Sequence, residues 1–221
     1  QKIKSPLILI SSKKILVKQI LKLKFKKKIK LLNKKNFHHQ KLDNKTINLI
    51  NVNFNQKKAF EKISKKSNKF IEKSFNIAFE IIKKKKINKL INGPISKKHF
   101  LGNKYLGITE YISSKFSKRQ VCMLIYNKEL SVSPITTHLP IKQVTKNINS
   151  KTISKKISII NSFYKKNLGF IPKIAVLGLN PHCESIYKFN EDERIIKPLI
   201  KNLKKKYKIS GPFSADTIFI K

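Results

Sequence analysis

The sequence predicts an α/β fold with a mainly parallel central sheet flanked by helices. Short apolar runs alternate along the chain with longer segments whose apolar residues recur at helical spacing, a pattern typical of this class. One run, KIAVLGL at 173–179, is continuously apolar after its first residue, as in a strand that is covered on both faces. With 221 residues, 40% of them hydrophobic, the chain can bury a core, which excludes a disordered tail.

The first half of the chain alternates two strands with two helices. The run PLILI at 6–10 predicts a short buried strand, and apolar residues at helical spacing predict a helix over 13–24. INLINVNF at 47–54 is rich in residues that favour strands. Segment 58–82 carries an apolar stripe with a period of about 3.6 residues, and the lysines at 83–86 suit the C-terminal end of a helix dipole.

The second half continues the alternation. A strand is expected at 89–92, before Gly93-Pro94, and two more at 121–126 and 130–137, which a short Asn-Lys connection joins. The remaining expected elements are helices at 141–148, 151–164 and 191–206 and the apolar strand at 173–179.

The chain is strongly basic, with 51 Lys and Arg against 11 Asp and Glu and a formal net charge of +40. A nucleic-acid-binding surface is one interpretation of this charge. The other is codon bias, because Lys, Ile and Asn make up 104 of the 221 residues, and only Arg119 and Arg194 are arginines. A surface that reads phosphates usually uses arginine as well. No helix-turn-helix, zinc-finger or RNP-like pattern is evident, so we expect no specific nucleic-acid partner.

Several other classes are excluded by what the sequence lacks. The two cysteines, Cys122 and Cys183, build neither a disulfide scaffold nor a close metal-binding pair. No apolar run approaches the roughly 18–20 residues of a membrane span, and we expect a cytoplasmic protein without a membrane partner. The P-loop, GxGxxG, GxSxG and HExxH motifs are all absent from the sequence.

Polar loops follow the predicted strands. They are NGPISK (92–97), TTHLP (136–140) and LNPHCE (179–184), and GPFSADT (211–217) stands near the chain end. Ligands of open α/β sheets gather outside the carboxyl ends of the strands. These loops are therefore the candidate functional segments.

His138 and His182 each lie just past an apolar run, within a short polar loop. Neutral imidazole is a common ligand of transition metals, and the parallel placement favours a metal site. A hydrogen-bonded structural role is the alternative for each of them. Two histidines do not complete a site, because zinc sites use at least three protein ligands. For His38, His39 and His99 we expect surface positions.

Three further residues are candidates for phosphate, substrate or catalytic contacts. Thr109-Glu110 is typical of a helix start, and the Thr109 hydroxyl with the free N–H groups there could instead face a phosphate. Lys97 is a candidate phosphate partner or catalytic residue, but one lysine among 49 has little specificity. Asp216 is a candidate for orienting a substrate or cofactor, with a loop-capping role as the alternative.

Five motifs together resemble the 4-hydroxythreonine-4-phosphate dehydrogenase family in order and spacing. They are NGPISK (92–97), GITEY (107–111), TTHLP (136–140), GLNPH (178–182) with Glu184, and GPxxADT (211–217). The TTHLP and LNPH loops are specific in combination, and the similarity runs along essentially the whole chain. The resemblance implies an isocitrate/isopropylmalate dehydrogenase-like α/β fold, and residues 1–221 as part of a single dehydrogenase chain of two lobes.

The resemblance also implies an activity in pyridoxal 5′-phosphate biosynthesis. Such enzymes oxidise 4-phosphooxy-L-threonine with NAD, or NADP, and the 3-oxo acid loses CO2 to give 3-amino-2-oxopropyl phosphate. A divalent metal (Zn, Mg or Co) is held by three histidines, and the active site lies at a homodimer interface. Two metal ligands correspond to His138 and His182, and the family's substrate-binding His-Thr pair corresponds to Ile108 and Thr109.

The sequence departs from the family at three points. The N-terminal GDPAGIG motif is absent, and the chain stops soon after ADT, before the position of the third metal histidine. We therefore expect a fold that is incomplete at both ends and a fragment that is inactive by itself. Ile108 stands where the family has histidine, which leaves open a related metal-dependent dehydrogenase with another hydroxy-acid or phosphate substrate. A basic nucleic-acid-binding protein is the non-enzyme alternative.

Overall fold

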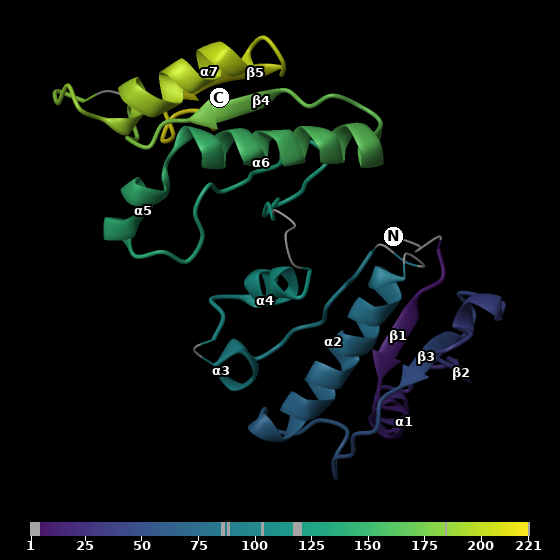
Figure 1. Ribbon diagram of the computed structural model, residues 1–221. Coiled ribbons are helices and arrows are strands. Elements are labelled where there is room, and N and C mark those ends of the chain that lie inside the picture. The colour runs from purple at the N-terminus through teal and green to yellow at the C-terminus, as the bar shows by residue number, and fades with distance from the viewer. Residues whose placement is uncertain are drawn as a thin grey trace. The chain divides into compact units, whose positions relative to one another are not determined.

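The computed structural model describes residues 5–84, 87, 89–102, 104–116, 121–183 and 185–220. The chain divides into two compact units, Gln1–Lys115 and Phe116–Lys221 (Figure 1). Within the described ranges, no helix is both long enough and apolar enough to cross a bilayer.

A three-stranded parallel sheet organises the first unit. Its order is β1-β3-β2, with bounds Ile8–Ser11, Ile47–Asn51 and Ile29–Leu31. Leu49 and Ile50 of the central strand are almost fully buried, as expected for β-forming residues between two neighbours. Asn48, also buried, donates hydrogen bonds to the carbonyl oxygens of Leu7 and Asp43, so its amide ties β3 to the preceding turn and to the start of β1.

Two longer helices accompany this sheet. Helix α1 (Lys13–Lys22) begins at Ser12, whose hydroxyl accepts a hydrogen bond from the Ile15 N–H as an N-cap. Helix α2 (Asn68–Lys83) buries one apolar face, which includes Phe75, Phe79 and Ile81. Short 3₁₀ turns lie at Phe37–His39 and Lys65–Ser67.

An aromatic cluster joins α2 to two short helices, α3 (Lys97–Phe100) and α4 (Ile108–Ser114). Tyr111 of α4 is buried, and its ring lies 5.2 Å from the rings of both Phe75 and Phe100, edge to face in each case. Burial raises the pKa of the Tyr111 hydroxyl. The cluster therefore fixes α4, the helix that carries Ile108 and Thr109.

The second unit contains a two-stranded parallel sheet of β4 (Ile174–Leu177) and β5 (Ile209–Phe213). Its helices are α5 (Ile141–Asn147), α6 (Ser150–Phe163) and α7 (Lys197–Leu203), with π-helical turns at Tyr164–Leu168 and Asp192–Ile196. Ile153 and Ile157 of α6 pack in one core cluster with Ile200 of α7 and Ile209 of β5. The Gly211-Pro212 peptide in β5 is cis.

The structure confirms an α/β fold with parallel strands flanked by helices, but the described strands form two sheets. The predicted strand at 89–92 is wrong, because these residues have no regular secondary structure. The predicted strands at 121–126 and 130–137 are also wrong, since only an isolated antiparallel bridge between Ile125 and Val132 forms there.

The helix predicted over 58–82 begins ten residues later, at Asn68. Residues before it are held by local hydrogen bonds instead, such as that from the Lys58 N–H to the Glu61 carboxylate, and the early apolar residues Phe60 and Ile63 are exposed. Strands β2 and β5 were not predicted. Residues 85 and 86 of the lysine run lie outside the described residues.

We expect Asp43 to stabilise the first unit only above acidic pH. Its carboxylate accepts hydrogen bonds from the N–H groups of Lys45 and Thr46, both at 2.8 Å, and the bond from Thr46 holds its pKa below the usual value. A lowered folded-state pKa gives stability that is present above the unfolded-state pKa and is lost as the pH falls through the folded value. Urea unfolding should therefore show that Asp43→Ala loses stability near pH 6 and that this loss shrinks towards about pH 3. A loss independent of pH would contradict the prediction, and Asp43→Asn, which keeps an acceptor without a titrating group, is the control.

Candidate functional site

Two of the predicted loops meet in the second unit. Because β4 and β5 are parallel, their carboxyl ends lie at the same edge of the sheet, and the loops at 178–183 and 214–217 leave from there. The carbonyl oxygen of Pro181 accepts hydrogen bonds from the Ala215 N–H and from the Ser214 hydroxyl, both at 2.8 Å. The LNPH and ADT motifs are thus joined directly.

The junction places His182 beside Asp216. Their Nδ1 and Oδ2 atoms are 3.5 Å apart, and the His182 side chain is 73% exposed. The Ser214 hydroxyl donates to the other Asp216 oxygen at 2.5 Å, and this bond, with a smaller contribution from His182, lowers the pKa of Asp216. Asp216 is therefore ionised at neutral pH, and its negative charge beside Nδ1 favours the ring proton on that nitrogen, which leaves the lone pair of His182 on Nε2.

Beneath this loop lies a buried carboxylate that no sequence motif marked. Asp192 is only 3% exposed, and its two oxygens accept hydrogen bonds from the N–H groups of Leu179 and Asn180 at 2.7 and 3.0 Å. The same space is closed to a side chain on Gly178, whose Cβ would lie 2.4 Å from the Cys183 sulfur. Burial raises the pKa of the Cys183 thiol, so the thiol stays protonated at neutral pH.

His138, the other predicted metal ligand, lies in the TTHLP loop of the same unit. Its side chain is exposed, and its backbone has a φ of 57°, in the left-handed region that non-glycine residues seldom adopt. The segment before it is anchored, because Ile135 packs against the core cluster and the Lys156 ammonium donates to the Pro134 carbonyl oxygen at 3.0 Å. Cys183, next to His182, also has positive φ, at 58°.

The remaining predicted site residues belong to the first unit. Ile108 and Thr109 are the first two residues of α4 and are half-buried, and Lys97 is the exposed first residue of α3. His99, expected at the surface, is half-buried instead, and its Nδ1 lies 2.8 Å from the Ser96 hydroxyl. Glu184 of the LNPHCE loop lies outside the described residues.

The described residues do not bring three metal-binding side chains together. No group of three or more His, Cys, Asp and Glu suited to a metal is found among them. The donors that are present, two exposed imidazoles with one facing an ionised carboxylate, match the ligand chemistry of a transition-metal site in part.

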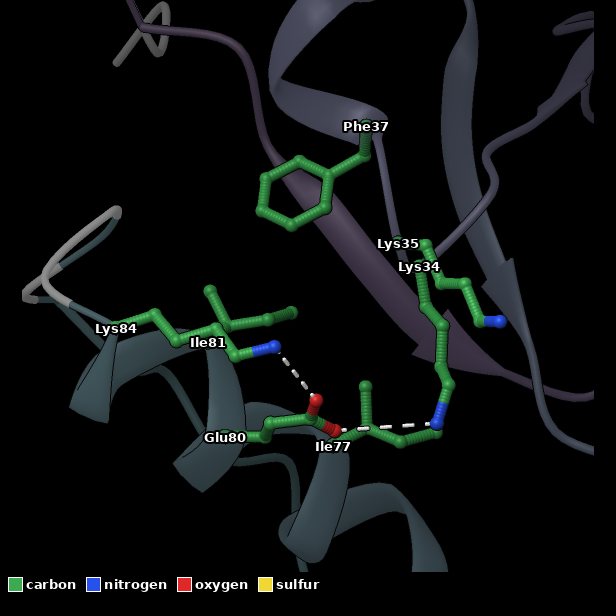
Figure 2. A pocket seen from close by; sticks show the side chains of 7 residues that line it. All are labelled: Lys34, Lys35, Phe37, Ile77, Glu80, Ile81 and Lys84. Atoms are coloured by element: carbon green, nitrogen blue, oxygen red, sulfur yellow. Dashed lines mark hydrogen bonds and ion pairs between the residues drawn. The ribbon is translucent and has the colours of Figure 1, made fainter.

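Two hollows lie beside α2 in the first unit. The smaller has a volume of about 30 Å³, enough for a water molecule or two, and Figure 2 shows Glu80 on its wall between the ammonium groups of Lys34 and Lys84. The hydrogen bond from Lys84 lowers the pKa of Glu80. The larger, of about 530 Å³, lies near the end of β3, and its polar lining residues are all exposed. Neither hollow includes a predicted site residue.

The chain is similar to known proteins along its length. It matches, over residues 2–221, the family model described as "Pyridoxal phosphate biosynthetic protein PdxA". It is 34% identical over 178 residues to the 4-hydroxythreonine-4-phosphate dehydrogenase of Sulfurihydrogenibium sp. (strain YO3AOP1), covering 78% of this chain and 54% of that protein. The enzyme of the same name from Wigglesworthia glossinidia brevipalpis is 40% identical over 144 residues, 61% of this chain and 42% of that protein.

The fold is also shared with a solved structure. The crystal structure of 4-hydroxythreonine-4-phosphate dehydrogenase from Klebsiella pneumoniae superposes with a TM-score of 0.75 at 22% identity, over 96% of this chain and 67% of that chain. At this identity the likeness establishes the fold. The chain spans about half the length of the curated relatives it matches.

Proposed function

Because the chain belongs to the pyridoxal phosphate biosynthetic protein PdxA family, we propose that the whole protein oxidises 4-phosphooxy-L-threonine with NAD. The oxidation would be followed by decarboxylation to 3-amino-2-oxopropyl phosphate. The observation that carries the proposal is the junction of the LNPH and ADT loops, which sets His182 against the ionised carboxylate of Asp216. The proposal concerns the whole protein, since the chain spans about half the length of its relatives.

The two histidines are proposed to hold a divalent metal together with a third ligand from outside this chain. The negative charge of Asp216 beside Nδ1 favours the proton of His182 on that nitrogen and so leaves Nε2 as the donor atom, an arrangement common for metal-binding histidines that lie next to a carboxylate. Imidazole donors favour Zn or Co over Mg. When bound, the metal would lower the pKa of the substrate hydroxyl as a Lewis acid.

Residues of the first unit are proposed to bind the substrate. The Thr109 hydroxyl, half-buried at the start of α4, can donate to or accept from the substrate, and the aromatic cluster around Tyr111 holds that helix in place. Lys97 is an exposed cation that could pair with the phosphate. The net charge of +40 gives a positive field that attracts a phosphorylated substrate and is screened by salt. A homodimer and the use of NAD, with NADP as the alternative, are carried over from the family resemblance.

We expect His182→Ala to abolish both metal binding and NAD reduction in the full-length protein. The wild type should reduce NAD with 4-phosphooxy-threonine when divalent metal is added and should stop when a chelator is added. His138→Ala should behave as His182→Ala does, whereas His39→Ala, at an exposed histidine of the first unit, should match the wild type. Absence of wild-type turnover with added metal would refute the function, and stoichiometric metal in both variants would refute the ligand assignment.

A second candidate function keeps the reaction and changes the substrate. Ile108 puts an apolar side chain at the position where the family has a hydrogen-bonding histidine. Such a replacement favours a hydroxy acid or phosphate ester that lacks the polar group this histidine would contact. Comparison of NAD reduction across a panel of phosphorylated hydroxy acids would distinguish the two substrates.

A further inference from the structure

We propose that Asp192 is a positioning residue whose buried carboxylate fixes the loop that carries His182. The inference depends on the proposed function at one point only, namely that His182 is a metal ligand. Asp192 lies outside the loops that the motifs identify, at the first residue of the π-helical turn before α7.

The Asp192 carboxylate supplies the hydrogen-bond acceptors for the backbone just after β4. The Gly178 N–H donates to the Phe213 carbonyl oxygen at 2.9 Å, and the next two N–H groups, those of Leu179 and Asn180, donate to Asp192. Buried N–H groups without partners are costly, and bonds to a carboxylate are stronger than bonds between neutral groups. Asp192 therefore fixes the direction in which the loop leaves the sheet.

Asn180 transmits this constraint to His182. Its side-chain oxygen accepts a hydrogen bond from the His182 N–H at 3.2 Å, and its carbonyl oxygen accepts one from the Cys183 N–H at 3.0 Å. The turn that presents His182 is thus built on a residue that Asp192 holds by the backbone. The contact between Pro181 and the Ser214-Ala215 segment then brings His182 to Asp216.

Two variants test the two links separately. Asp192→Asn keeps the size of the side chain but sets an NH2 group against one of the two N–H donors. Asn180→Ala removes the side-chain bond to His182 at a half-buried position and leaves Asp192 in place. Glu193→Gln is the matched control, because it removes one negative charge from the neighbouring exposed residue, whose carboxylate pairs with Lys197.

The measurements use the 221-residue chain and do not depend on bound metal. Hydrogen exchange of at least one of the Leu179 and Asn180 amides should rise about tenfold or more in Asp192→Asn. The His182 ring resonance should shift in both Asp192→Asn and Asn180→Ala, and the control should change neither signal. An unchanged His182 resonance in folded Asp192→Asn would overturn the proposal, and if that variant does not fold, Asp192→Glu, which keeps the charge but moves the carboxylate, takes its place with the same expected result.

Cobalt affinity extends the test to the proposed metal. With Co²⁺ as the probe and the full-length protein as the sample, Asp192→Asn should bind about 10- to 100-fold more weakly than the control, the range seen when supporting partners of metal ligands are removed. Unchanged affinity despite a shifted ring resonance would overturn the link between positioning and metal binding. If the wild-type full-length protein takes up no Co²⁺, the metal assignment fails, while the exchange and resonance measurements on the 221-residue chain still decide the role of Asp192.

Discussion

Replacing Gly211 by alanine is expected to destabilise the second unit by about 2–5 kcal/mol, from backbone strain and overpacking together. Gly211 lies in β5 with a φ of 122°, a conformation that side chains rarely adopt. A Cβ at this position would lie 2.3 Å from the Val176 carbonyl oxygen in the adjacent strand. Because that atom belongs to the backbone, the clash cannot be relieved by a side-chain rotation.

The close approach arises from an irregularity in the sheet. Ala175 pairs with Ser210 and Leu177 with Phe213, so β5 has one residue more than β4 between the two pairs. Such a bulge bends the strand, and glycine is the residue that commonly permits it. The bulge directly precedes Ser214 and Asp216, so Gly211→Ala should also disturb the contact between Asp216 and His182.

Urea unfolding of two other glycine variants separates the causes. Gly169 has a φ of 80°, but a Cβ added there would have nothing within 4 Å, so Gly169→Ala should cost about 1 kcal/mol from strain alone. Gly93 has neither a positive φ nor a close neighbour, and Gly93→Ala should change stability by no more than about 0.5 kcal/mol. A Gly211→Ala variant as stable as Gly93→Ala would show that the two strands do not approach as described.

The same strand shows why part of the fold could not be predicted. β5 has the sequence ISGPF, and glycine and proline inside a short run argue against a strand when local preference alone is considered. It forms because Ile209 is buried in the core cluster and because β4 offers a parallel partner. Both are tertiary effects. Without β5, the meeting of His182 with Asp216 could not be predicted either.

Segment 121–137 shows the opposite case, in which strands were predicted but do not form. Its apolar residues favour strands, yet several are exposed, including Ile125 and Val132, the two residues of the isolated bridge. A strand exists only when a partner completes its hydrogen bonds, and the described residues supply a single bridge. Apolar alternation therefore predicted the composition of a strand but not its pairing.

The loops themselves were predictable because their residue types are unusual in this chain. Against a background of Lys, Ile and Asn, the clustering of Thr, His, Pro and Glu at the ends of predicted strands marked 136–140 and 179–184 as candidates. The role of Asp192 could not be predicted from the sequence, because an acidic residue at a predicted helix start is ordinarily explained by the helix dipole. Its distance of 13 residues from Leu179 in the chain gave no local signal.

Replacing Ile108 by histidine is expected to raise kcat/KM for 4-phosphooxy-threonine about 10- to 100-fold in the full-length protein. One hydrogen bond from histidine to a charged or strongly polar substrate group accounts for a change of this size. Ile108 is the first residue of α4 and only half-buried, so the larger polar ring can be accommodated without opening the core. The helix itself should stay in place, because the buried ring of Tyr111 anchors it among Phe75 and Phe100.

Leu106→His is the matched control, since it adds the same side chain two residues earlier at a position that is 58% exposed. It should leave kcat/KM unchanged. A rise in Ile108→His alone would assign 4-phosphooxy-threonine as the substrate. It would also show that isoleucine at position 108 weakens substrate binding because it lacks a hydrogen-bonding group. A fall in Ile108→His alone would contradict the prediction and would favour a substrate whose apolar surface packs against the isoleucine, because the imidazole would then remove a contact and bury a polar group without a partner.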